Sequence, residues 1–305
     1  MLAVTLAGCG SQPRQQADII IEHAHSGGSS LDISPDSKTL ASGGWSGFVR
    51  LWDLETGRNL RSWRAHTDSV NGIFFLPDGT ILTVGYDGRV SLWNRTGKEI
   101  RSRKVLPVTA SDIDIAHDRF VTGHKDGTLI VWNLGSGQEI KRFRPHRKLI
   151  RSVAISPDGA MIASSATDTR VALASIVSGK VRYLENPSSD PRTLAFSPGG
   201  DSLYGAGWFR IFRWNLGTGR IQTLDTEHKG IINDIQFTPD SQLASISRQT
   251  DSAVLFLDPL SGKTNARYQQ HDLCGVAVDV SPDGRYLATT SDDASVRIWK
   301  LSTPK

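Results

Sequence analysis

Few residues in this sequence have the types and spacing that catalysis or metal binding needs. Ser261-Gly262-Lys263-Thr264 ends like a phosphate-binding loop, but the first glycine of that motif would fall at Leu257. His23 and His25 could contact one metal ion, yet no third ligand accompanies them. No nucleophile elbow or pair of catalytic carboxylates stands out. We therefore predict no catalytic residue, no metal site and no cofactor.

The two cysteines and the composition narrow the class of protein further. Cys9 and Cys274 are too few for a disulfide framework or a metal set, and we expect Cys274 to be a partly buried structural thiol. The 305 residues are 38% hydrophobic and 22% charged, which is typical of a soluble globular chain. No stretch approaches the ~20 apolar residues of a membrane helix.

A repeat with a period near 41 residues organises the chain. Its marker is the Trp that ends an apolar strand such as Val49-Arg50-Leu51-Trp52. The marker falls at positions 52, 93, 132, 174, 214, 257 and 299, with Ala174 and Leu257 in place of Trp. Successive markers are 41, 39, 42, 40, 43 and 42 residues apart. This spacing is typical of four-stranded propeller blades.

Two kinds of turn recur in phase with the marker. Six repeats have a turn with Pro at its second position, as in Ser156-Pro157-Asp158-Gly159, whereas the third has Ala116-His117-Asp118. A Thr-Gly or Ser-Gly pair, such as Thr56-Gly57, follows the marker strand. Together these features predict an all-β fold, a single seven-bladed β-propeller with four antiparallel strands per blade.

From about residue 18 to 301 the chain resembles the WD-repeat β-propeller family. In that family a His, a Ser or Thr, an Asp and the marker Trp form a hydrogen-bonded tetrad inside each blade. A buried polar chain of this kind is tolerated only when each member has a partner. The resemblance implies complete tetrads in blades two and seven, made of His66, Thr83, Asp87 and Trp93, and of His271, Thr289, Asp293 and Trp299.

The other blades match the tetrad only in part, and we expect blades four to six to be the less rigid part of the ring. Blade one has Ser46 where Asp is expected, blade three has no evident His, and blade five keeps only Trp214. His117 and His124 fall outside the pattern. The remaining members are His25, Ser42 and Trp52 in blade one, Thr122, Asp126 and Trp132 in blade three, His146, Ser164 and Asp168 in blade four, and His228, Ser247 and Asp251 in blade six.

The N-terminal strand is expected to close the ring. The last repeat stops after its third strand, near Leu301. The segment 18–22 precedes His25 as residues 60–63 precede His66, so it fits the missing fourth strand of blade seven. Closure of this kind removes a sheet edge.

Leu6-Ala7-Gly8-Cys9 resembles the bacterial lipobox, which implies cleavage before Cys9 and a lipid on its thiol. A signal peptide needs a basic start and an apolar core of ~7–15 residues, and residues 1–7 provide neither. We therefore expect either that the gene begins upstream of Met1 or that this chain has been shortened. The chain then divides into a signal-peptide remnant, a lipid-anchored tether, the propeller and a tail, at residues 1–8, 9–17, 18–301 and 302–305.

Positive charge is concentrated in one part of the chain. Residues 58–151 hold 17 Lys and Arg against 9 Asp and Glu, a net charge of +8, and the rest of the chain has a net charge of −4. The charge could attract an anionic partner or lipid headgroups, or belong to solvated outer strands. The candidate patch is Lys141, Arg142, Arg144, Arg147, Lys148 and Arg151.

Loop residues just before the tetrad Asp are the better candidates for recognition, because the resemblance implies that partners bind there. Large aromatics in tight loops are favoured anchors, since they contribute area at a low cost in entropy. They could instead stack on one another over the channel mouth. The candidates at this position are Trp45, Tyr86 and Lys125, and Trp208 and Phe209 fall in the same turn of blade five.

These features favour a non-catalytic scaffold for other proteins. We expect a monomeric propeller anchored by lipid to a bacterial envelope membrane, the outer one where two are present. The alternatives are the same scaffold in the cytosol, and an enzyme or ligand-binding propeller with a central-channel site. Nucleic acid is not expected, because no base-stacking module accompanies the basic residues.

Overall fold

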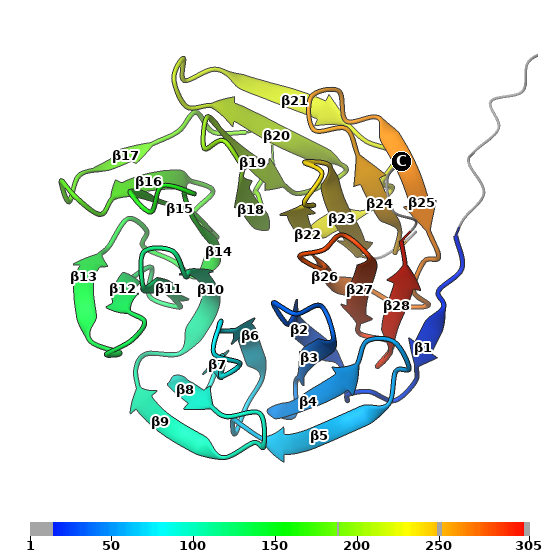
Figure 1. The fold of residues 1–305 in the computed structure, drawn as a ribbon. Coiled ribbons are helices and arrows are strands. Elements are labelled where there is room, and N and C mark those ends of the chain that lie inside the picture. The colour runs from blue at the N-terminus through cyan, green and yellow to red at the C-terminus, as the bar shows by residue number, and fades with distance from the viewer. Residues whose placement is uncertain (1–14, 188, 249–251, 302–305) are drawn as a thin grey trace, which may run out of the picture.

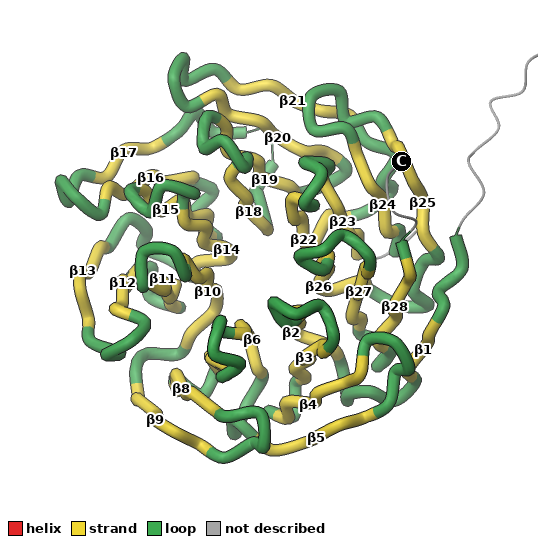
Figure 2. Tube along the Cα trace, viewed as in Figure 1, coloured by secondary structure: helices red, strands yellow, loops and turns green. Residues whose placement is uncertain are grey.

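The computed structural model describes residues 15–187, 189–248 and 252–301, and these form seven four-stranded antiparallel sheets arranged as blades around a central channel (Figure 1). Strands and loops account for all of the described residues, without a helix (Figure 2). The prediction of a seven-bladed β-propeller is confirmed. The predicted segments 1–8 and 302–305, and most of 9–17, lie outside the described residues.

Each blade contributes one strand to each of four concentric layers (Figure 1). The innermost strands, which line the channel, are β2 (Gly28–Ile33), β6 (Val70–Phe75), β10 (Val108–Asp114), β14 (Ile150–Ile155), β18 (Thr193–Phe196), β22 (Ile231–Phe237) and β26 (Gly275–Val280). The second strands are β3 (Thr39–Gly44), β7 (Ile81–Gly85), β11 (Arg119–His124), β15 (Met161–Ala166), β19 (Ser202–Ala206), β23 (Leu243–Arg248) and β27 (Tyr286–Ser291).

The two outer layers contain the marker strands and the solvent-facing strands. The third strands are β4 (Phe48–Asp53), β8 (Arg89–Trp93), β12 (Leu129–Asn133), β16 (Val171–Ser175), β20 (Arg210–Asn215), β24 (Val254–Leu257) and β28 (Val296–Lys300). The outermost strands are β5 (Asn59–Arg64), β9 (Glu99–Lys104), β13 (Glu139–Phe143), β17 (Val181–Tyr183), β21 (Ile221–Asp225), β25 (Thr264–Tyr268) and β1 (Ile19–Ile21).

Burial changes across the layers in the order that packing requires. Every residue of β3 and β7 is buried, because these strands lie between neighbouring blades on both faces. Five of the six residues of β5 are exposed. The apolar clusters join adjacent blades: Val49 of blade one packs with Ile73 and Trp93 of blade two. Burial between stacked sheets therefore holds the ring together.

The N-terminal strand closes the ring, as predicted. β1 pairs antiparallel with β28, with Ile19 opposite Ile298 and Ile21 opposite Val296. Gln15 extends the closure, because its carbonyl oxygen accepts hydrogen bonds from the backbone N–H of Gln269 at 2.8 Å and from Nε1 of Trp299 at 3.1 Å. The N-terminal segment thus bridges blades six and seven.

Buried aspartates on the innermost strands connect adjacent blades. Oδ2 of Asp112 accepts a hydrogen bond from the backbone N–H of Ile155 at 2.7 Å, and Oδ2 of Asp234 accepts one from Val278 at 3.1 Å. Asp32 of blade one accepts the same kind of bond from Phe75 of blade two, and Asp279 of blade seven accepts one from Ile33 of blade one. Burial raises the pKa of Asp112 to about 6 and that of Asp234 to about 7. These carboxylates therefore belong to the framework of the channel wall.

Candidate partner-binding face

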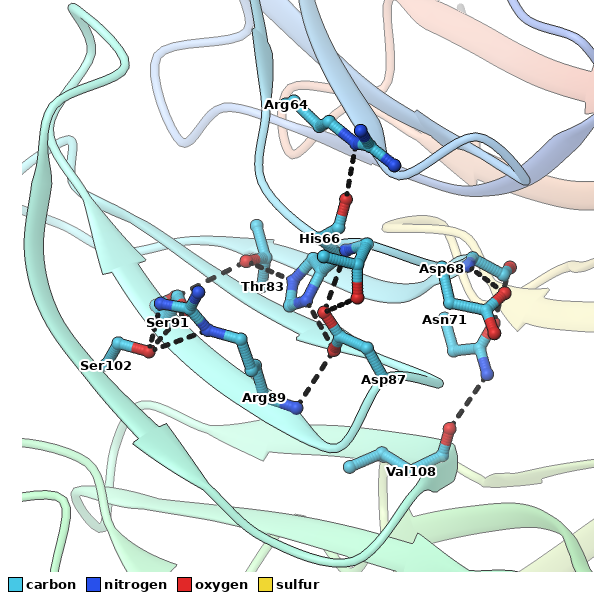
Figure 3. A network of polar contacts seen from close by, with 12 residues as sticks. Arg64, His66, Asp68, Asn71, Thr83, Asp87, Arg89, Ser91, Ser102 and Val108 are labelled. Carbon is cyan, nitrogen blue, oxygen red and sulfur yellow. Dashed lines mark hydrogen bonds and ion pairs between the residues drawn. The ribbon is translucent and has the colours of Figure 1, made fainter.

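The tetrad of blade two holds the loop between β7 and β8, and Figure 3 shows three of its members, His66, Thr83 and Asp87. Nδ1 of His66 lies 3.0 Å from Oδ1 of Asp87, and Nε2 lies 2.8 Å from Oγ1 of Thr83. Nε1 of Trp93 donates to the same Thr83 hydroxyl at 2.9 Å. Burial lowers the pKa of His66, although the charge of Asp87 opposes this shift. The ring therefore stays neutral at neutral pH, and Nδ1 carries the proton that Asp87 accepts.

Blade seven shares part of this arrangement, and the role predicted for its Trp is wrong. Nδ1 of His271 lies 3.0 Å from Oδ2 of Asp293, and Nε2 lies 2.7 Å from Oγ1 of Thr289. Nε1 of Trp299, however, donates to the carbonyl oxygen of Gln15 rather than to Thr289. The N-terminal strand supplies an acceptor from outside the repeat, so this indole serves ring closure.

Blades one and three replace the missing tetrad member with another side chain. In blade one, Nη1 of Arg50 lies 3.0 Å from Nδ1 of His25, where an Asp stands in blade two. In blade three, Nε2 of His124 lies 2.9 Å from Oγ1 of Thr122. The expectation that His124 falls outside the pattern is wrong. His124 lies two residues after Thr122 on one strand, and residues with that spacing share a face.

Blade six corrects a second assignment. Nε2 of His228 lies 2.9 Å from Oγ of Ser245, whereas the sequence predicted Ser247 as its partner. Leu243 pairs with Leu257, fourteen residues on, whereas the corresponding pair in blade two is twelve apart. The hairpin is two residues longer, so counting back from the marker selects the wrong Ser. Asp251 lies outside the described residues.

Blades four and five complete the series. Nδ1 of His146 lies 3.0 Å from Asp168, and Nε2 lies 2.9 Å from Oγ of Ser164, with no indole at Ala174. Nε1 of Trp214 donates to the carbonyl oxygen of Glu185. The predicted lower rigidity of blades four to six stays a prediction.

The loops between the second and third strands form one face of the ring, which we call the tetrad face. The innermost strands begin at this face and the second strands end there. Six of its loops consist entirely of described residues, and they span 45–47, 86–88, 125–128, 167–170, 207–209 and 292–295. In blades one to four and in blade seven, the contacts between His and Ser or Thr lie beneath these loops and fix them to the blades. Blade five has no such contact among its described residues, and backbone hydrogen bonds, such as that from the N–H of Phe209 to the carbonyl oxygen of Gly230 at 3.1 Å, hold its loop.

The five predicted recognition residues all lie on the tetrad face, but they are not all alike. Trp45 is 52% exposed, Trp208 48% and Phe209 47%, whereas Tyr86 is half-buried and Lys125 is exposed. The rings of Trp208 and Phe209 lie 5.7 Å apart. Within the described chain neither of these two rings contacts Trp45 or Tyr86. The structure thus brings only the blade-five pair together.

Phe209 has an unusual backbone for a bulky residue. Its φ is +62°, in the left-handed region that favours glycine. Gly47, Gly88 and Gly127 occupy the corresponding place in blades one to three, and Thr169 and Ala294 occupy it in blades four and seven, all with φ between +69° and +85°. A large exposed ring at such a position costs stability, and strained residues of this kind cluster at functional sites. The turn therefore imposes the positive φ in each of these blades, and blade five differs in placing a large, half-exposed ring there.

The predicted basic patch is not a single surface. Arg142 on the outer strand β13 pairs with Glu139 on the same strand at 2.7 Å. Lys141 donates to the carbonyl oxygen of Ile176 in the next blade at 2.7 Å. Arg151, by contrast, lies on the innermost strand β14 and lines the channel. Arg151 therefore belongs to the channel wall, whereas Lys141 and Arg142 belong to an outermost strand.

The central channel encloses a cavity of about 540 Å³, lined by the innermost strands. Within the ranges that the structure describes, no three His, Cys, Asp or Glu side chains are grouped to hold a metal ion. In the same part of the chain, no helix is long and apolar enough to cross a membrane. Cys274, just before β26, is a free and half-buried thiol.

Comparison with known proteins agrees with this geometry. The family description "WD domain, G-beta repeat" matches four segments, residues 18–53, 57–94, 137–173 and 262–300. Each segment begins near the outermost strand of one blade and continues through the three inner strands of the next. The four matched blades are one, two, four and seven, in which a His from the preceding loop contacts a Ser or Thr.

Three relatives give the range of similarity. Apoptotic protease-activating factor 1 of Rattus norvegicus is 25% identical over 85% of this chain, and Angio-associated migratory cell protein of Homo sapiens is 22% identical over 89%. Eukaryotic translation initiation factor 3 subunit I of Bombyx mori is 29% identical over 45%. The chain spans 22%, 67% and 46% of these proteins. All three are eukaryotic, and none bears on the lipobox.

Proposed function

Because this chain is a seven-bladed β-propeller that carries WD40 repeats, we propose that it is a non-catalytic scaffold that binds protein partners on its tetrad face. The observation that carries the proposal is the exposed pair of Trp208 and Phe209, with Phe209 in a strained backbone conformation. Backbone hydrogen bonds hold this loop, because the N–H of Phe209 donates to Gly230 at 3.1 Å and the N–H of Ile232 donates to Gly207 at 2.9 Å. Exposed aromatics on a loop held in this way lose little entropy on binding. The names of the relatives, which include a subunit of an initiation factor, agree with a role in assemblies.

Site-specific photocrosslinking in cells that make the protein tests this proposal. A photoreactive residue at position 45 or 209, on the tetrad face, should crosslink one discrete protein. The same residue at position 58 or 220, in exposed turns between third and fourth strands on the opposite face, should not. Equal crosslinking from both faces, or none from the tetrad face, would contradict the proposal.

A single substitution separates recognition from stability. We expect Phe209→Gly to abolish capture of the crosslinked partner while the free energy of unfolding stays equal or rises by up to about 1 kcal/mol, because glycine accepts φ near +62° without strain. Urea unfolding and pull-down of the purified variant measure both. Trp45→Ala should also lose the partner with little change in melting temperature. A Phe209→Gly variant that is clearly destabilised yet still binds would show that the ring is structural.

We also propose that the chain is held at a bacterial envelope membrane by a lipid on Cys9. Leu6-Ala7-Gly8-Cys9 supports this proposal, and the residues lie outside those that the structure describes. A lipid contributes ~0.8 kcal/mol per buried methylene, so several acyl chains would anchor the chain firmly.

Intact mass and detergent partitioning of the protein expressed from its own gene, with the upstream codons, test the anchor. We expect a mass that corresponds to Cys9 plus acyl chains, and partitioning into the detergent phase. Cys9→Ser should move the protein to the aqueous phase. An unmodified N-terminus in the aqueous phase would favour the cytosolic scaffold instead.

A further inference from the structure

One position recurs at the mouth of the channel on the tetrad face. In six blades the pairing of the innermost and second strands skips one residue, which forms a β-bulge. Bulges re-aim side chains. The skipped residues line the channel and are Ser29, Asn71, Thr109, Arg151, Asn233 and Val276.

Arg192 takes this position in blade five. The backbone N–H of Leu194 donates to Oγ of Ser152 at 3.0 Å, just as the N–H of Val278 donates to Asp234 between blades six and seven. In both pairs the acceptor is one residue after the mouth position and the donor is two residues after it. This register places Arg192 beside Arg151, on adjacent blades and at one level of the channel. Both arginines line the cavity.

Four of the seven mouth residues connect blades. Their side chains donate to a backbone carbonyl oxygen of the next innermost strand. Figure 3 shows this bond for Asn71, whose Nδ2 donates to Val108 at 2.8 Å. The other three bonds run from Ser29 to Val70, from Thr109 to Ile150 and from Asn233 to Gly275. These side chains have a structural role that accounts for them.

Arg151 and Arg192 do not make this bond. Among the described residues, neither guanidinium group has a hydrogen bond or an ion pair, and Nε of Arg151 is buried without a partner. Burial lowers the pKa of Arg192, and the charges of Arg151 and Arg248 lower it further. Arg248, at the same face, is already paired with Asp292 at 3.5 Å. Two adjacent cations therefore face the channel mouth without a partner.

Nearby acids do not neutralise this pair. The carboxylates of Asp112 and Asp234 are buried and accept backbone hydrogen bonds from the next blade. Their raised pKa values also reduce their negative charge near neutral pH. The negative charge of Asp190 raises the pKa of Arg192, but Asp190 makes no ion pair with it within the described chain. Unpaired cations in a partly buried site attract an anion strongly.

We infer that Arg151 and Arg192 form a docking site for an acidic segment of a protein partner, with a carboxylate side chain of that segment held between the two guanidinium groups. Planar guanidinium groups bind carboxylates through paired hydrogen bonds. Trp208 and Phe209 stand exposed on the same face of blade five, the blade that carries Arg192, so they would contact flanking residues of the segment. The inference rests on the proposed scaffold function and names the chemistry of its partner.

Fluorescence anisotropy with a dye-labelled hexaglutamate peptide and the purified full chain tests this site. The test variant is Arg151→Gln with Arg192→Gln. The control variant is Arg58→Gln with Arg220→Gln, which removes the same charge from exposed turns on the opposite face. We expect the control to bind as the unchanged protein does, and the test variant to bind at least about tenfold more weakly. Both should keep their melting temperature, and hexaglutamine should not bind.

Three outcomes would overturn the inference. The first is equal loss of affinity in both variants, which would show an effect of net charge alone. The second is failure of the unchanged protein to bind hexaglutamate. The third is displacement by inorganic phosphate together with tighter binding of phosphate than of peptide, which would show a small-anion site only. Because the peptide is a defined probe, its binding is independent of the crosslinking result, so each proposal can fail without the other.

Discussion

We expect removal of residues 1–22 to lower the free energy of unfolding of the whole propeller by about 5 kcal/mol. The deletion removes β1, so β28 becomes an open sheet edge. Ile19 and Ile21 lose their packing against the cluster that contains Trp52, and because both are only partly buried, this loss is worth up to about 1.5 kcal/mol each. Nε1 of Trp299 also loses its acceptor on Gln15.

Urea unfolding followed by tryptophan fluorescence measures this loss. A ring unfolds cooperatively when each blade is packed on both faces, so we expect one transition shifted to lower urea. Removal of residues 1–14 leaves all described contacts in place and is the matched control. Ile20→Ala is a second control, since this side chain is 42% exposed. A separate early transition, with the main one unchanged, would show that the strand only frays.

Thr83→Val should destabilise the propeller by about 3 kcal/mol, although the two side chains have nearly the same shape. Thr83 is completely buried, and its hydroxyl is the partner of both Nε2 of His66 and Nε1 of Trp93. Valine leaves two buried polar groups without a partner, at a cost of about 1–3 kcal/mol each. The loop that carries Tyr86 should loosen with the tetrad.

Chemical denaturation of the Thr83→Val variant measures this cost, with Thr96→Val as the control. The Thr96 hydroxyl donates to Oδ1 of Asn94 in an exposed turn, so its loss should change stability by less than about 1 kcal/mol. Equal effects of the two substitutions would mean that the tetrad adds nothing beyond an ordinary surface hydrogen bond.

The proposed partner site and the framework differ in how they respond to substitution. Few of the contacts that hold the ring involve the side chains of Phe209, Arg151 and Arg192. Their loss should therefore weaken binding and leave the free energy of unfolding nearly unchanged. Thr83 and the N-terminal strand should affect both. Measuring stability and binding for each variant therefore separates residues that recognise a partner from those that position them.

The repeat pattern by itself determined the fold. Seven markers spaced 39 to 43 residues apart, with turns in phase, specify local hairpins, and each hairpin forms between strands that are adjacent in sequence. Ring closure was also predictable, because a missing fourth strand at one end matched an extra strand at the other. Loop aromatics such as Trp45 were identified because no strand pattern accounted for them.

The tertiary structure decided how side chains pair across these hairpins. His124, Ser245 and the Trp299 partner Gln15 could not be assigned by aligning repeats, since hairpin length and a strand from the far end of the chain set those contacts. The placement of Arg151 beside Arg192 depends on the bulge at Arg151 and on the packing of blades four and five. Local patterns fix which strands form, whereas the distances between charges and hydrogen-bonding groups on different strands exist only once the blades are packed.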